Sequence, residues 1–237
     1  MSGMYPRYQQ AMTRVVRKIH GISAVVLALY LVPHIVNHIV GLGGVEAHIA
    51  FMHAVRVVYR LPVVEGLLLF CVLLQAVTGL SLFLLGFRER RGIVPWLQAC
   101  AGAYLAFFLY IHVRAVLFGR SVMHVDTNFY YAAASLHVPS VSFRWWFATY
   151  YFLAVLSLFV HFGCAAWWRL RRQPPRTRAL AVALPAAAGA LIATLIVMTL
   201  AGAFYRVTIP AEYQIRPPPA TCGAPAADAQ PGCPKAT

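Results

Sequence analysis

Residues 19–42 have the sequence IHGISAVVLALYLVPHIVNHIVGL, which no Asp, Glu, Lys or Arg interrupts. A helix needs about 20 residues to cross a hydrocarbon core of about 30 Å. Lipid offers no hydrogen-bond partner to backbone amides, so a run of this kind must be helical. The stretch therefore predicts a membrane-spanning helix and fixes the solvent in which the rest of the chain folds.

Four further runs of this kind follow, at residues 61–87, 93–113, 145–168 and 179–205. The first of these four contains one acid, Glu65, near its start. Hydrophobic residues make up 61% of the 237 residues and charged residues 11%, against about a quarter charged in a soluble domain. We predict an all-α integral membrane bundle of five transmembrane helices.

The net charge of +14 would suit a nucleic-acid partner, but basic residues in a membrane protein first report topology. They cluster before the first run and in the loops after the second and fourth runs: Arg7, Arg14, Arg17, Lys18, Arg88, Arg90, Arg91, Arg169, Arg171, Arg172, Arg176 and Arg178. The amino terminus is therefore predicted inside and the carboxyl terminus outside, with no nucleic acid bound. Three parts follow: a basic cytoplasmic head (1–18), the bundle (19–205) and a periplasmic Pro/Ala-rich tail (206–237).

Two cysteines, Cys222 and Cys233, lie in this outer tail. An oxidising compartment would allow a disulfide between them. Unpaired thiols and contacts with a partner are the alternatives, and the sequence leaves all three open.

The loops on the outer side carry two further patterns. Residues 43–60 repeat apolar residues with a near-helical period, which is typical of a helix lying on the membrane surface. Residues 118–143 are longer and aromatic, and could cap the bundle or contact a lipid-soluble substrate. Histidines at this end are interpreted as solvated or interfacial: His38, His48, His53, His124 and His137.

Polar residues within the spans are costly in lipid and are therefore candidates for function. His34 and His112 lie at similar heights in the outer halves of two helices, as the two axial ligands of one haem must. Two imidazoles on one iron favour electron transfer with little rearrangement. The alternative is that these histidines only hydrogen-bond across helices.

His161 needs a partner in the inner half, and the residue of matching depth on the second helix is Gln75. Glutamine is a poor iron ligand because its amide oxygen is a hard, weak donor compared with imidazole. The pattern therefore predicts an outer haem site directly and leaves an inner one open.

Six short motifs resemble those of a known family: RKIHGIS (17–23), YLVPHIVNH (30–38), PVVE (62–65), QAVTGL (75–80), YIH (110–112) and VHFG (160–163). In their order along the helices they resemble the five-helix cytochrome b subunits of succinate dehydrogenase and fumarate reductase, over residues 14–205. The resemblance implies a multi-pass anchor in the bacterial inner membrane that holds one or two haem b groups. It also implies an iron-sulfur subunit and a flavoprotein on the cytoplasmic face, and electron exchange with membrane quinone.

The resemblance also implies residue roles. His34 and His112 would ligate the outer haem, and His161 and Gln75 the inner one. Glutamine stands where the family has histidine, so the chain would hold one haem, hold a second by an unusual ligand, or have lost the cofactor.

Glu65 would be a proton carrier at an outer quinone site, with a solvated helix cap as the alternative. His20, Ser23 and Arg17, near the inner end of the first helix, would hold a haem propionate or a second quinone. For Arg17, the competing interpretation is that a basic residue at the inner end of a helix reflects only the orientation of the helix in the membrane.

Two other functions compete with the cytochrome. A haem-free membrane anchor or assembly protein would keep the bundle without redox chemistry, and Gln75 favours it. A transporter with histidines on a proton path is less favoured, because the chain has no internal repeat of the kind that transporters show.

Overall fold

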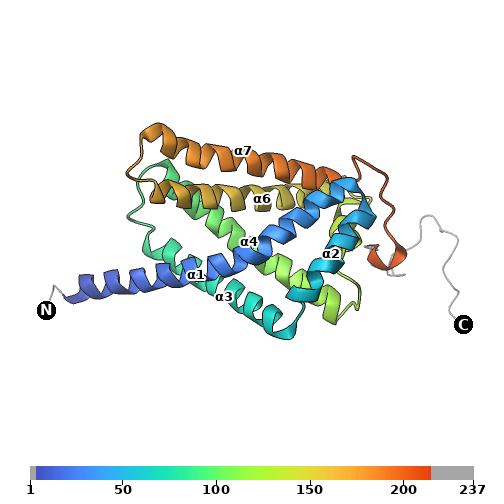
Figure 1. Cartoon of the computed structure of the whole chain (residues 1–237), viewed down its shortest axis with the longest axis horizontal. Coiled ribbons are helices and arrows are strands. Elements are labelled where there is room, and N and C mark those ends of the chain that lie inside the picture. Colours follow the sequence, from blue (N-terminus) through green and yellow to red (C-terminus); the bar gives the residue numbers. More distant parts are fainter. Residues whose placement is uncertain (1–3, 215–237) are drawn as a thin grey trace, which may run out of the picture.

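Five long helices dominate the computed structural model, which describes residues 4–214. They are α1 (Met4–Val40), α3 (Pro62–Leu85), α4 (Ile93–Ser121), α6 (Val141–Arg169) and α7 (Pro175–Leu200), and no strand occurs among the described residues (Figure 1). Each is long and apolar enough to cross a membrane. The prediction of an all-α, five-span bundle is confirmed, and the protein is a multi-pass membrane protein.

Helix α1 is longer than its apolar run. It starts at Met4 and continues without a break through the segment predicted as a separate basic head. Long basic side chains can extend from a helix end to the interface, so Arg14, Arg17 and Lys18 do not terminate it. The amino-terminal part of α1 projects beyond the other helices in Figure 1.

The helices form two groups. Helix α6 packs along α7 and against α4, while α1 packs along α3, which also contacts α4. Glycines allow the closest of these contacts: a Cβ atom on Gly189 of α7 would lie 2.6 Å from Cβ of Phe159, and one on Gly163 of α6 would lie 2.9 Å from the carbonyl oxygen of Ala181. Small residues at such crossings let helix backbones approach in lipid, where no hydrophobic force draws helices together.

The two ends of the bundle differ, and we name them by their content. The basic end carries the α3–α4 and α6–α7 loops with their arginines. The capped end carries the short elements: η1 (Gly41–Gly43), α2 (Val45–Tyr59), α5 (Phe129–Ala133), η2 (Ala134–Leu136) and η3 (Ala211–Tyr213). The predicted helix within residues 43–60 is confirmed.

The capped end has its own apolar core. Phe129 of α5 is fully buried and packs with Val45 of α2, Leu136, and Ile196 and Leu200 of α7. Of the two interpretations of the 118–143 loop, the capping one is therefore what the contacts support.

Polar contacts fasten this cap. Arg56 of α2 forms an ion pair with Asp126 at 2.5 Å and donates to the carbonyl oxygen of Thr127 at 2.9 Å. The Tyr205 hydroxyl donates to the carbonyl oxygen of Gly41 at 2.5 Å, and Val207 and Ile209 pack on the core. The first part of the predicted tail thus belongs to the cap, whereas Cys222 and Cys233 lie outside the described residues.

Alanine at Gly189 tests the α6–α7 contact. The added Cβ would push Phe159 away, and overpacking of this kind costs about 1–3 kcal/mol of unfolding free energy. We expect a lower thermal unfolding midpoint in detergent for Gly189→Ala. Gly66→Ala is the control, because a Cβ atom added at Gly66 would have no neighbouring atom within 4 Å, and alanine favours the helix. Equal midpoints for the two variants would contradict the close packing.

Candidate functional site

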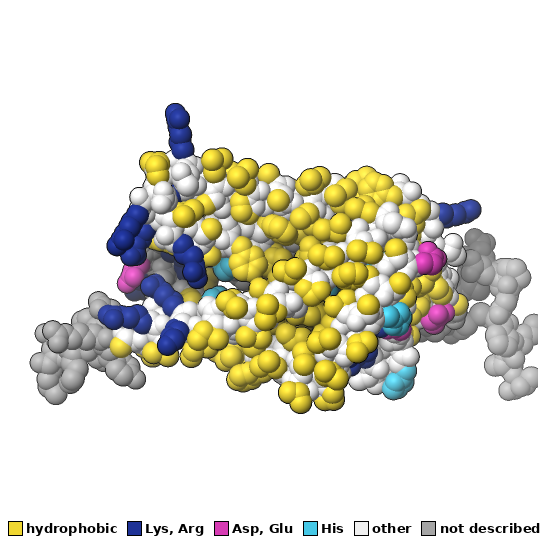
Figure 2. Space-filling model, in the orientation of Figure 1, with side chains coloured by type: hydrophobic (Ala, Val, Ile, Leu, Met, Phe, Trp, Pro, Cys, Tyr) yellow, Lys and Arg dark blue, Asp and Glu magenta, His cyan; other side chains and the backbone are white. Residues whose placement is uncertain are grey.

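Two pairs of histidines face each other between helices. The ring centres of His34 on α1 and His112 on α4 are 6.1 Å apart, and those of His20 on α1 and His161 on α6 are 6.4 Å apart. His20 and His34 are 14 residues apart, nearly four helical turns, so α1 presents both from one face. Figure 2 shows an opening between α1 and the layer of α6 and α7, with histidine side chains visible inside it.

The hydrogen bonds of His20 settle which ring nitrogen carries the proton. Its Nδ1 lies 2.8 Å from Oγ1 of Thr78. The Thr78 hydroxyl donates a hydrogen bond to the carbonyl oxygen of Leu74 at 2.5 Å. Thr78 must therefore accept from His20, which places the proton on Nδ1. Nε2 of His20 keeps a free lone pair, as a metal ligand requires.

His161 is held in the same state. Its Nδ1 lies 3.0 Å from the carbonyl oxygen of Gln98, which can only accept. The proton is again on Nδ1, and Nε2 again keeps its lone pair. Both rings of this pair are thus oriented by a neighbouring helix, α3 for His20 and α4 for His161.

Two glycines give these rings their room. A Cβ atom on Gly79 of α3 would lie 3.4 Å from Cε1 of His20, and one on Gly102 of α4 would lie 2.9 Å from Cε1 of His161. Any larger residue at Gly102 would displace the ring. The two glycines therefore keep the space beside this pair free of side chains.

Gln75, predicted as a possible inner ligand, bonds to α1. Its amide nitrogen donates to the carbonyl oxygen of His20 at 2.6 Å and to Oγ of Ser23 at 2.8 Å. The ring opposite His161 belongs to His20. Arg17 is exposed about one turn nearer the basic end than His20, where the prediction put it.

The pair nearer the capped end is lined by aromatic rings. Tyr30 stacks on His34 at 5.4 Å with its hydroxyl oxygen 3.4 Å from Nδ1, and Phe108 stacks on His112 at 5.1 Å. His34 and His112 come from different helices at one height, as the depth argument predicts. The stacked rings limit rotation of both imidazoles.

A third set of histidines extends from this pair into the cap. His38 lies 5.0 Å from His34, and His48 of α2 lies 5.4 Å from His38, between ring centres. His48 is only 3% exposed, packs on Phe129 and has its Nε2 3.1 Å from the amide nitrogen of Asn37. The interpretation of His48 as solvated or interfacial is wrong, because the cap folds over α2; an aromatic loop following an amphipathic segment was the signal available.

Glu65 does not stand alone. Its carboxylate accepts two hydrogen bonds from the guanidinium of Arg120, across α3 and α4 at the capped end, and about a quarter of each side chain is exposed. Bidentate pairing of this kind fixes the carboxylate in place. The sequence gave no sign that the two residues pair.

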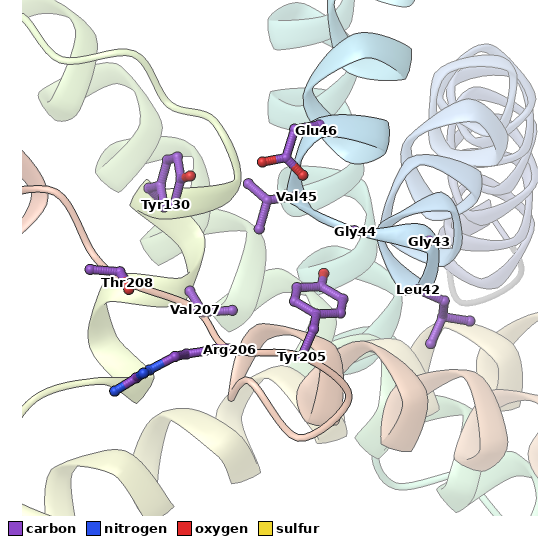
Figure 3. A pocket seen from close by; sticks show the side chains of 10 residues that line it. All are labelled: Leu42, Gly43, Gly44, Val45, Glu46, Tyr130, Tyr205, Arg206, Val207 and Thr208. Atoms are coloured by element: carbon purple, nitrogen blue, oxygen red, sulfur yellow. The ribbon is translucent and has the colours of Figure 1, made fainter.

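A second hollow lies at the capped surface, with a volume of about 460 Å³. In Figure 3 Tyr205 points toward the α2 side of the hollow, where Glu46 lies, while Arg206 points away. The residues that line the hollow include no histidine. The histidine-lined interior is therefore the stronger candidate for a functional site.

Comparisons with protein-family models, with curated proteins and with solved structures found no match to this chain. Among the described residues, no group of three or more His, Cys, Asp or Glu side chains could hold a metal ion. Fold and site together define a five-span helix bundle whose interior carries histidines in facing pairs.

The burial of His48 predicts a pH dependence of stability. Burial lowers the pKa of His48 to about 4, and repulsion by His34 and Arg56 acts in the same direction. The unfolded chain then binds the proton more tightly, so stability is complete above pH 6.5 and falls as the pH drops toward 4. We expect a loss on the order of 2 kcal/mol that His48→Gln removes, measured as unfolding midpoints across this range. A matched control is His53→Gln, at an exposed position of α2; equal pH profiles for both variants and the parent would refute the assignment.

Proposed function

We propose that the protein is the cytochrome b subunit of a quinone-linked oxidoreductase, and that it relays electrons through haem b held by His34 and His112. The observation that carries the proposal is the distance of 6.1 Å between the centres of these two rings, at one height on α1 and α4. The resemblance of the motifs around these and other residues to the succinate dehydrogenase and fumarate reductase family also supports it.

The distance suits two imidazoles on one iron. A histidine nitrogen binds a first-row metal at about 2 Å and lies about 1 Å from the centre of its ring. Two rings on opposite sides of one metal therefore have centres about 6 Å apart. Histidines that only hydrogen-bond across helices would bond a group on a neighbouring helix. Among the described residues, His34 bonds only to Tyr30 of its own helix, and His112 makes no such bond.

The number of ligands favours haem over a bare metal ion. A protein-only site needs three or more ligands, and the described residues offer no such group. Haem needs only two axial ligands and, when bound, supplies one-electron oxidation and reduction. The chain's own contribution is to orient His34 by Tyr30 and His112 by Phe108, and to exclude water by the cap.

The orientation and partners belong to the same proposal. With the amino terminus inside, the basic end faces the cytoplasm of a bacterium and the capped end faces the periplasm, as the arginine distribution favours. The arginine-bearing loops and the projecting part of α1 then offer the surface on which an iron-sulfur subunit and a flavoprotein would dock. Quinone would exchange electrons within the bilayer.

Haem binding is tested by the reduced-minus-oxidised visible spectrum of the purified protein. We expect a sharp α band, and loss of one haem per chain in His34→Ala or His112→Ala by pyridine haemochrome assay, because each variant removes an axial ligand. His53→Ala, an exposed histidine on α2, should leave the spectrum unchanged.

The opposite outcome is equally clear. Folded protein expressed with ample haem that shows no α band would sink the cytochrome proposal and favour the haem-free anchor. Unchanged haem content in both variants would move the site away from this pair.

We further propose that Glu65 carries a proton at the quinone site on the capped side. The supporting observation is its place at the membrane edge of α3, where its carboxylate is about a quarter exposed and accepts hydrogen bonds from Arg120. Such a carboxylate can take up a proton while lipid-soluble substrate approaches from the side.

Glu65→Gln tests this role. We expect oxidation of the reduced protein by a short-chain quinone to slow about 100-fold or more, with haem content unchanged, because a positioned acid or base contributes at least about that much. Glu46→Gln, an exposed acid at the same end, is the control. Equal rates in the two variants would exclude Glu65 from proton transfer.

A further inference from the structure

We infer that His20 and His161 are the axial ligands of a second haem, near the basic end. His20 then takes the role for which the sequence pattern offered only Gln75. The inference deepens the proposed function and rests on it. Its observations, however, are independent of the His34 and His112 pair.

The first observation is the pairing itself. The ring centres of His20 and His161 are 6.4 Å apart, close to the 6.1 Å of the other pair and to the value of about 6 Å for two imidazoles on one metal. The rings come from α1 and α6, the two helices on either side of the opening seen in Figure 2.

The second observation is the protonation state. The Thr78 hydroxyl and the Gln98 carbonyl each accept a hydrogen bond from Nδ1, so both Nε2 atoms carry lone pairs. The bond of each ring to a neighbouring helix uses Nδ1 and leaves Nε2 without a hydrogen-bond partner among the described residues. Two rings locked as acceptors suit a common electrophile between them, which is what iron provides.

The third observation is the shape of the surroundings. Gly79 of α3 lies beside the His20 ring, and Gly102 of α4 lies beside the His161 ring. Neither glycine places a side chain next to the rings. A flat macrocycle bound between His20 and His161 needs close approach to its neighbours. Any larger residue would narrow the space at both places.

Gln75 fits this assignment as a brace. Its amide bonds to the His20 carbonyl and to Ser23, and so fixes the turn of α1 that carries the ligand. His20 and His34 then lie roughly 20 Å apart along α1, which places one site in each half of the membrane.

The first test is the haem content of single variants. We expect two haems per chain in the parent protein, one in His20→Ala and one in His161→Ala, with the His34 and His112 haem retained, and two in Gln75→Ala. Loss of a haem in Gln75→Ala with two retained in His20→Ala would overturn the inference in favour of Gln75. A parent protein with one haem that depends on His34, and not on His20, would overturn it while leaving the proposed function standing.

A ligand exchange separates coordination from folding. His20→Met should keep two haems and raise the midpoint potential of one of them, because methionine in place of histidine raises the potential of haem iron. The other midpoint should stay fixed. Two unchanged midpoints would show that His20 has only a structural role.

The positioning role of Thr78 gives a matched pair of variants. Thr78→Val removes the acceptor for Nδ1 of His20 and should weaken haem retention at this site about 10- to 100-fold, as loss of a partner that orients a metal ligand does. Thr194→Val is the control, since Thr194 makes the same bond to the carbonyl four residues earlier but on the exposed face of α7. Equal haem retention in both variants would contradict the role of Thr78.

Discussion

Lipid gives a polar group no partner, so every polar side chain within this bundle has to find its partner on the protein. The bonds of Gln75 and Thr78 join α3 to α1, and Tyr104 donates to the carbonyl of Tyr150 at 3.0 Å, joining α4 to α6. The same constraint decides the state of the histidines. A ring whose Nδ1 is bonded to a neighbouring helix can offer only Nε2, and the scaffold thereby determines what each imidazole can bind.

The contacts between helices differ between the two sides of the bundle. Glycines let the backbones of α6 and α7 approach closely, and these two helices share the most extensive contact in the bundle. On the other side, His34 of α1 faces His112 of α4, and His20 of α1 faces His161 of α6. The closest backbone packing thus lies between α6 and α7, whereas histidine rings lie between α1 and the helices α4 and α6.

The sequence predicted the five spans because a run of about 20 apolar residues has one solution in lipid. It also predicted His34 opposite His112, since both lie well inside their runs. It missed His20 as the ring opposite His161 because α1 was taken to begin at Ile19, which put His20 at the helix end. The helix starts at Met4, so His20 lies several turns inside it, and its distance of 14 residues from His34 was the signal that a helical face was shared. The pairing of Glu65 with Arg120 and the burial of His48 depend on how the cap folds, which no local pattern encodes.

Gln75 and His20 lie at one contact between α3 and α1. Helices α1 and α3 are adjacent, and Gln75 and Thr78 both contact the turn of α1 that bears His20. A histidine on either helix could therefore reach the same point between α1, α3, α4 and α6. When α1 supplies the imidazole, a residue of histidine's size but without its basicity is suited to the facing position, because it can bond the α1 backbone without competing for a metal. Glutamine at position 75 thus bonds to the turn of α1 that carries His20, through the His20 carbonyl and the Ser23 hydroxyl.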